Sequence, residues 1–179
     1  MNSIDLSVES KLILAQKLGF TDHKLKKVEL FAKEVLAYNK KYNLISKNSE
    51  RDIWNRHIVD SAQLINFIDI RKHRTLSDLG TGGGFPGIIL SIFFEDILTF
   101  HVKLYEKSKV KNMFLRNLIE NMGIKNTSIY DNDYQSHNID ADYIVSRAFK
   151  KLPEMLRISR EIVKKPHKLI VMLGKSAQD

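Results

Sequence analysis

Residues 78–87 read Asp78-Leu79-Gly80-Thr81-Gly82-Gly83-Gly84-Phe85-Pro86-Gly87, between a short strand-like run and an apolar segment of helical length. Because glycine has no side chain, main-chain N–H groups in such a loop can approach a ligand closely. The helix that follows would offer the partly positive end of its dipole to a carboxylate or a phosphate. This stretch predicts a strand, a ligand-binding loop and a helix.

The chain changes its pattern at residue 75, where short β-type segments begin to alternate with helical ones. This alternation is typical of an α/β fold with a mostly parallel sheet and right-handed crossovers. Ligands of such sheets bind beyond the carboxyl ends of the strands, where the strand order reverses. The predicted strands are 75–79, 101–106, 127–130, 143–146 and 168–173, and the predicted helices between them are 86–94, 107–122 and 151–164.

The first 74 residues have helical periodicity throughout. A short helix is expected over residues 8–18, and a longer one begins at Thr21 or Asp22, either of which can cap it. A third helix is expected from Ser49, because Ser49-Glu50-Arg51-Asp52 resembles a capping box. We therefore expect residues 1–74 to form a helical extension packed on the same domain as a cofactor-binding core over residues 75–179.

Composition limits the class of protein. The 179 residues, 43% of them hydrophobic, suffice for one domain with a substantial core. The absence of cysteine excludes disulfides, thiolate metal sites and cysteine nucleophiles. No basic leader with an apolar core and no apolar run of membrane-spanning length is present, so we expect a cytoplasmic protein without membrane contact. We further expect a monomer with no bound metal.

The net charge of +8 indicates an anionic partner such as nucleic acid. Much of the excess lies in the first 74 residues, where lysines are interleaved with aromatic side chains. This mixture of lysine and aromatic side chains is suited to binding an RNA backbone, but it is equally typical of a solvated, lysine-rich helix face. The lysines concerned are Lys24, Lys26, Lys27, Lys33, Lys40, Lys41 and Lys47.

Two nucleotide cofactors compete for the glycine loop. Residues 82–87 satisfy the G-x-G-x-x-G pattern of dinucleotide-binding proteins. However, Asp78 and Gly80 precede the pattern, and Pro86 removes an N–H group where a pyrophosphate would need one. The alternative register, Asp78-x-Gly80-x-Gly82-x-Gly84, resembles the first motif of S-adenosylmethionine-dependent methyltransferases. That cofactor has an amino acid end and no pyrophosphate, so an acidic group and bare main chain suit it better.

Glu106 ends the second predicted strand, where a carboxylate can accept hydrogen bonds from both ribose hydroxyls of a nucleoside cofactor. Its alternative role is a favourable negative charge at the start of the next helix. The combination of Asp78 with Glu106 at this spacing favours the cofactor role.

Four segments together resemble one family, the small-subunit ribosomal RNA guanine-N7 methyltransferases called RsmG, formerly GidB. They are Tyr38-Asn39-Lys40-Lys41-Tyr42-Asn43-Leu44, Arg56-His57-Ile58-Val59-Asp60-Ser61, the loop over residues 78–87, and Ser146-Arg147-Ala148-Phe149. The resemblance covers roughly residues 30–175. It implies a Rossmann-like class I methyltransferase sheet, S-adenosyl-L-methionine as cofactor, and 16S rRNA or the small ribosomal subunit as partner.

The resemblance also implies which residues contact the cofactor. Together with Glu106, these are Gly80, Phe85, Tyr134, Gln135 and Arg147. Tyr134-Gln135 stands where the family usually has alanine-glutamate, and Leu173-Gly174-Lys175 where relatives commonly have lysine-glycine. The chain stops at Asp179, just past the fifth predicted strand, so the closing pair of strands that the family normally carries is expected to be absent.

The implied reaction needs no general base, because guanine N7 carries a free lone pair and no proton. Positioning would supply most of the catalysis, so no catalytic acid or base is assigned. Phe85, Tyr134 and Phe149 are candidates for stacking on the target base, with core packing as the alternative. His57 and Asp60 lie on one helix face, where we expect a His-Asp contact that fixes the helix, or else a wall of the cleft.

Three classes of function remain open at this point. The leading hypothesis is an enzyme that forms 7-methylguanosine in a loop of 16S rRNA. A dinucleotide-dependent oxidoreductase is the alternative enzyme. The third possibility is an inactive relative that only binds RNA.

Overall fold

The computed structural model describes residues 6–71, 74–131, 134, 139–147 and 150–173. A sheet of five parallel strands lies at its centre, in the order β3-β2-β1-β4-β5. The strands are β1 (Thr75–Leu79), β2 (His101–Tyr105), β3 (Thr127–Tyr130), β4 (Tyr143–Arg147) and β5 (Lys168–Met172). The predicted parallel α/β fold is therefore confirmed, and each strand lies within one residue of its expected end.

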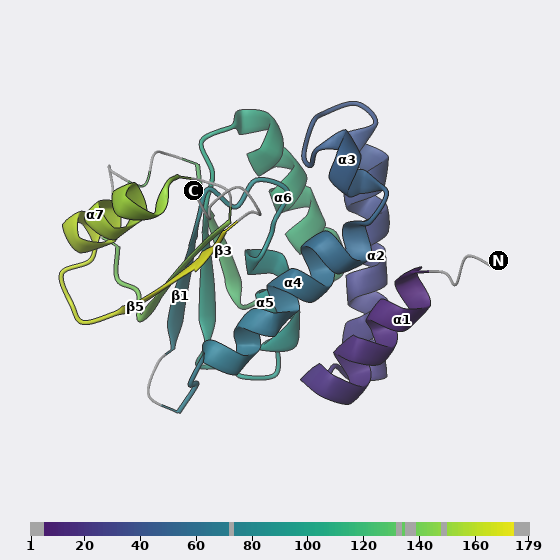
Figure 1. Cartoon of the computed structure of the whole chain (residues 1–179), viewed down its shortest axis with the longest axis horizontal. Coiled ribbons are helices and arrows are strands. Elements are labelled where there is room, and N and C mark those ends of the chain that lie inside the picture. The colour runs from purple at the N-terminus through teal and green to yellow at the C-terminus, as the bar shows by residue number, and fades with distance from the viewer. Residues whose placement is uncertain (1–5, 72–73, 132–133, 135–138, 148–149, 174–179) are drawn as a thin grey trace.

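The strand order reverses next to β1. The chain moves outward from β1 to β2 and β3 through α5 (Gly87–Phe93) and α6 (Lys109–Met122). It then returns to β4 beside β1 and continues to β5 through α7 (Leu152–Ile162). Figure 1 shows α7 on one face of the sheet and α5 and α6 on the other. The glycine loop thus leaves β1 at the switch point, where α/β sheets bind ligands.

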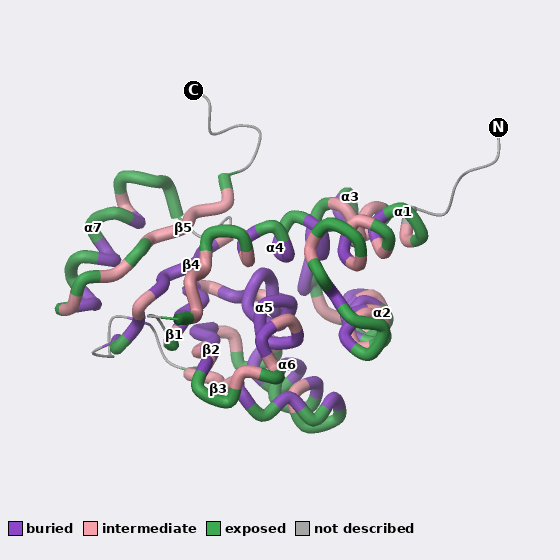
Figure 2. The backbone as a smooth tube through the Cα atoms, turned by 90° about the horizontal axis from the view of Figure 1, so that it is seen from below, coloured by how far each residue is buried: buried purple, intermediate pink, exposed green. Residues whose placement is uncertain are grey.

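Side chains that alternate along the strands belong to two hydrophobic cores, one on each face of the sheet. Leu76, Leu104 and Val145 face α5 and α6 in the larger core, whereas Leu79 and Ile144 face α7 in the smaller one. This period of two is what a sheet covered on both faces requires. Helix α5 is almost wholly buried (Figure 2), because helices pack on it from outside as well.

The segment before β1 supplies those outer helices. It contains α1 (Leu6–Leu12), the π-helix η1 (Ile13–Lys17), α2 (Asp22–Asn39), α3 (Lys47–Glu50), the π-helix η2 (Trp54–Val59), α4 (Asp60–Ala62) and the 3-10 helix η3 (Gln63–Phe67). Helix α2 packs on α5 and α6, and α4 packs on α5. Phe31 and Val35 of α2 belong to the same core as Ile88 of α5. The helical segment and the sheet therefore share one core.

Capping side chains mark the starts of three helices, α2, α3 and α6. Thr21 caps α2 and Ser108 caps α6, each accepting a hydrogen bond from a main-chain N–H group three residues on. Gly123 ends α6 in the left-handed conformation. The expected cap at Ser49 is wrong. Ser46 caps α3 by accepting from the N–H of Ser49, and the Ser49 hydroxyl donates back to the Ser46 carbonyl.

Asp78, at the end of β1, joins the strand to α5. Its side chain is fully buried, and its Oδ2 accepts hydrogen bonds from Thr81 Oγ1 at 2.6 Å and from the Gly87 N–H at 2.8 Å. A charge in such a site is costly to desolvate. Burial therefore raises the pKa of Asp78 to about 7, although both hydrogen bonds favour the charged form.

Within the described ranges, no helix is long and apolar enough to cross a membrane. The same residues contain no group of three histidine, aspartate or glutamate side chains arranged to hold a metal ion.

Replacing Gly87 by alanine should destabilise the protein by about 3 kcal/mol, the upper end of the usual cost of overpacking a rigid core. The added Cβ would lie 2.2 Å from Leu104 Cδ2 and 2.8 Å from Asp78 Oδ2, both buried. Chemical denaturation measures the loss. Gly123→Ala is the matched control, because its Cβ meets nothing within 4 Å and costs only the left-handed backbone, about 1 to 2 kcal/mol. An equal loss in both variants would contradict this packing.

The buried carboxyl of Asp78 should make folding sensitive to pH. Its folded pKa lies above its unfolded value, so the folded state binds more protons, and stability from this group falls as the pH rises through about 7. We expect the unfolding free energy of the wild type, relative to Asp78→Asn, to fall between about pH 4 and about pH 7, the unfolded and folded pKa values of this carboxyl, and to level off above that range. Other groups titrate alike in both proteins and cancel. A difference that stays constant or rises with pH would refute this assignment.

Candidate functional site: a pocket between the glycine loop and the helical segment

The glycine loop connects β1 to α5 through three residues with positive φ. The φ angles are 70° at Gly80, 59° at Gly82 and 98° at Gly84. A Cβ at Gly84 would lie 2.7 Å from Ile88 Cγ1, so that position lacks room as well as a permitted conformation. At Gly82, in contrast, the nearest atoms to an added Cβ are 3.9 and 4.0 Å away. The loop therefore exposes its main chain at Gly82 and buries it at Gly84.

Glu106 lies against this loop. Its Oε2 accepts a hydrogen bond from the Gly82 N–H at 3.0 Å, and its Oε1 accepts one from the Ser108 N–H at 2.8 Å. The second bond satisfies an N–H group at the start of α6, so the alternative role of Glu106 at the helix terminus is present. Each carboxylate oxygen can accept a further bond. Glu106 can therefore accept hydrogen bonds from ribose hydroxyls next to the exposed main chain of the glycine loop.

Asp78 does not contribute its carboxylate to the site. The sequence suggested an acidic group close to the amino acid end of the cofactor, but Asp78 is buried behind the loop and binds Thr81 and Gly87. The physical reason is that the first N–H group of α5, at Gly87, and the Thr81 hydroxyl hold the carboxyl group at the buried end of β1.

Arg147 extends from the end of β4 to the helical segment. Its Nη1 lies 2.6 Å from His57 Nδ1, and its Nη2 donates to the Arg56 carbonyl oxygen. Burial, aided by the charges of Arg147 and Arg56, lowers the pKa of His57 to about 3. The neutral ring can therefore accept the bond from Arg147. Among the described side chains, the partner of His57 is thus Arg147 rather than the expected Asp60.

The opposite wall of the site is the turn between α2 and α3. Asn39, the last residue of α2, accepts hydrogen bonds through Oδ1 from the N–H groups of Leu44 and Ile45, at 2.8 and 3.0 Å. Its Nδ2 donates to Glu50 at 3.2 Å. One buried amide side chain therefore holds this turn against the glycine loop.

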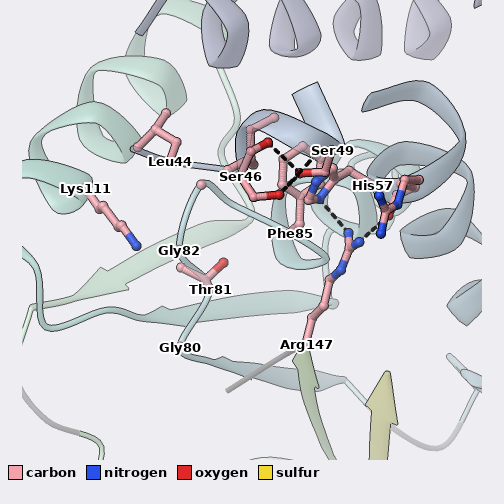
Figure 3. A pocket seen from close by; sticks show the side chains of 13 residues that line it. Leu44, Ser46, Ser49, His57, Gly80, Thr81, Gly82, Phe85, Lys111 and Arg147 are labelled. Carbon is pink, nitrogen blue, oxygen red and sulfur yellow. Dashed lines mark hydrogen bonds between the residues drawn. The ribbon is translucent and has the colours of Figure 1, made fainter. Parts of the chain in front are cut away.

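These walls enclose a pocket of about 350 Å³ (Figure 3). This volume is within the range of small-molecule sites. It brings together three predicted site residues, Gly80, Phe85 and Arg147, and Glu106 lies one hydrogen bond away at Gly82. The lining is formed by Leu44, Ile45, Ser46, Ser49, Arg56, His57, Gly80, Thr81, Gly82, Gly83, Phe85, Lys111 and Arg147.

The two remaining predicted contacts with the cofactor are Tyr134 and Gln135. Tyr134 is buried beside Leu79 and Tyr105 in the smaller core and does not line the pocket. Gln135 lies outside the described residues, as does Phe149, one of the stacking candidates. Phe85 is 4% exposed and its ring packs against Phe31 and His57, so most of it serves the core.

Sequence reasoning missed several lining residues. Arg56 stood beside His57 in a quoted motif but received no role, and Lys111 lies in the first turn of α6, where only its position after Glu106 could have suggested it. Ser46 and Ser49 carried no signal, because their place depends on how the turn after α2 folds back.

The residues present suit a nucleoside with an amino acid end better than a pyrophosphate. The N–H groups of Gly80 and Thr81 already donate to the Tyr105 carbonyl oxygen, and that of Gly82 donates to Glu106. A pyrophosphate would need such N–H groups free and would be repelled by the carboxylate. Ribose hydroxyls, in contrast, can donate to that carboxylate.

Solved structures with a similar fold include methyltransferases. A protein-L-isoaspartate O-methyltransferase matches with a TM-score of 0.57 and 16% identity, over 92% of this chain and 54% of its own. Coclaurine N-methyltransferase, solved with N-methylheliamine and SAH, matches with a TM-score of 0.51 and 13% identity, over 96% of this chain and 60% of its own. At such low identity these likenesses show the fold alone, and they confirm the predicted Rossmann-like class.

Sequence relatives are closer. The family described as GidB, rRNA small subunit methyltransferase G, matches residues 24–179. The protein of that name from Pelagibacter ubique is 37% identical over 84% of this chain and 71% of its own length. That from Magnetococcus marinus is 33% identical over 76% and 61%, and that from Borrelia turicatae 30% identical over 98% and 81%. The predicted family is thereby confirmed: the chain belongs to the rRNA small subunit methyltransferase G family.

Proposed function

We propose that this chain transfers the methyl group of S-adenosyl-L-methionine to N7 of a guanine in a loop of 16S rRNA of the small ribosomal subunit. The observation that carries the proposal is the pairing of Glu106 with the glycine loop through the Gly82 N–H. This pairing places the Glu106 carboxylate, an acceptor for ribose hydroxyls, beside the exposed main chain of the glycine loop. The adjoining pocket is large enough for a base.

In the proposed complex, Glu106 accepts the ribose hydroxyls and Gly80 admits the methionine part. Phe85 and Arg147 close the side toward the helical segment, and Tyr134 and Gln135 complete the set from beyond β3. When bound, the cofactor supplies an electrophilic methyl group on a sulfonium. The assignment of Tyr134 and Gln135 rests on the family resemblance alone.

The protein has little chemistry of its own to perform. N7 of guanine attacks through a lone pair and loses no proton, so catalysis consists of holding N7 in line with the methyl group and excluding water. Leu44, Ile45 and Phe85 give the pocket an apolar lining for that purpose. His57 is neutral and already bound to Arg147, so we assign no general base.

The proposed substrate also indicates which form of RNA the protein acts on and where it does so. A base buried in a duplex is out of reach, so the target guanine is taken from a loop or single strand. We propose that the protein acts as a monomer in the cytoplasm, on 16S rRNA or the small subunit. Residues 1–74 would serve as a helical extension of the cofactor-binding core over residues 75–179, and would supply one wall of the pocket.

The cofactor is tested by titration with S-adenosylhomocysteine and, separately, with NADH. We expect binding of the first only. Glu106→Gln should weaken it roughly 10- to 100-fold, the value of hydrogen bonds to a charged group. Glu120→Gln, an exposed change on α6, is the matched control and should leave affinity unchanged. Binding of NADH without S-adenosylhomocysteine would instead identify a dinucleotide enzyme.

The reaction is tested on small subunits from a strain that lacks the modification, followed by mass spectrometry of the nucleosides. We expect 7-methylguanosine with the wild type and none with Gly80→Asp, whose side chain and charge would occupy the cofactor position beside the loop. RNA binding without any methylated guanine in the wild-type reaction would favour the inactive, RNA-binding relative.

A further inference from the structure

The pocket carries an unbalanced positive charge. Arg56, Lys111 and Arg147 line it, and none of its described lining residues is acidic. Within the described part of the chain, no carboxylate lies within ion-pairing distance of Arg56 or Lys111. Arg147 binds only neutral groups there, the His57 ring and the Arg56 carbonyl. The carboxylate of Asp60 acts on Arg147 and Arg56 through its charge, but none of the described ion pairs joins it to either arginine, so all three cations can still bind an anion.

The lysines at the start of α2 differ in this respect. Lys24 is buried and bonds the Phe93 carbonyl and Asp96, each at 2.7 Å, while Lys27 pairs with Glu95 at 2.5 Å. Phe93 is the last residue of α5, and Glu95 and Asp96 follow it, so these partners lie at the end of the helix remote from the glycine loop. Lys24 and Lys27 therefore hold α2 against the core and are not available to RNA.

The cations of the pocket lie on two sides of the glycine loop. In Figure 3, Lys111 stands on one side of Gly82 and Arg147, with His57, on the other. The apolar side chains of Leu44 and Phe85 lie in the pocket with them. A nucleic acid strand has the complementary arrangement, because each nucleoside, which carries the base, is flanked by two phosphates.

We propose that Lys111 and Arg56, with Arg147, form a phosphate track, in which they contact the RNA phosphates that flank the target guanine while its base enters the pocket. His57 acts as a positioning residue, since its neutral ring fixes the Arg147 guanidinium without cancelling its charge. The inference rests on the proposed function. It adds the assignment of particular cations, two of which, Arg56 and Lys111, are not among the predicted cofactor contacts.

An oxyanion at this place could come from RNA or from the carboxylate of the cofactor. Salt dependence separates the two sources. Each phosphate contact with a single strand contributes about 0.7 to the slope of log K against log salt, whereas a cofactor carboxylate would change affinity for S-adenosylhomocysteine instead.

The experiment measures binding to 16S rRNA from a strain that lacks the modification, at several salt concentrations, for wild type, Arg56→Gln, Lys111→Gln and the double variant. We expect each single change to reduce the slope by about 0.7 and to weaken binding about fivefold near 0.1 M salt, with additive effects. Affinity for S-adenosylhomocysteine should stay at the wild-type value.

Lys26→Gln is the matched control, because Lys26 is an exposed lysine of α2 remote from the pocket. Its slope should equal that of the wild type, and thermal unfolding verifies that all variants are folded. Wild-type slopes in Arg56→Gln and Lys111→Gln would overturn the inference while leaving the methyl transfer intact. Loss of S-adenosylhomocysteine affinity with an unchanged slope would assign the cations to the cofactor. Failure of the wild type to bind S-adenosylhomocysteine at all would refute the proposed function itself.

Discussion

The structure depends on one buried carboxyl group. Asp78 ends β1 and accepts hydrogen bonds from the Thr81 hydroxyl and the Gly87 N–H, so a single side chain determines where the glycine loop begins and where α5 begins. Helix α5 is the layer on which both the sheet and the helices before β1 pack. A shift at Asp78 would therefore displace the loop, its contact with Glu106 and the core together.

The site is assembled from segments far apart in the chain. Arg147 on β4 reaches Arg56 and His57, which precede it by about 90 residues, and the turn after α2 forms the facing wall. No short motif could hold these parts by itself. The shared core beneath them, with Phe31 packed on Phe85, is what keeps the helical segment and the sheet in fixed positions.

Much of the fold followed from local patterns, since the strand periodicity and the cap at Thr21 act over a few residues. Tertiary contacts decided the rest. Ser49 matched a cap by type but lies inside the helix that Ser46 begins, and Asp78 matched a cofactor ligand but is covered by α5. The pairing of His57 with Arg147 and the place of Lys111 depend on elements that only the folded chain brings together.

The turn held by Asn39 has a consequence for the conditions under which the pocket keeps its shape. The bonds from Leu44 and Ile45 to the Asn39 side chain are buried and join neutral groups, so mobile ions screen them very little. Contacts between exposed cations and phosphates, in contrast, weaken steeply as ions accumulate. A change in salt concentration therefore changes the affinity for a polyanion, but it leaves the shape of the pocket that receives the base unchanged.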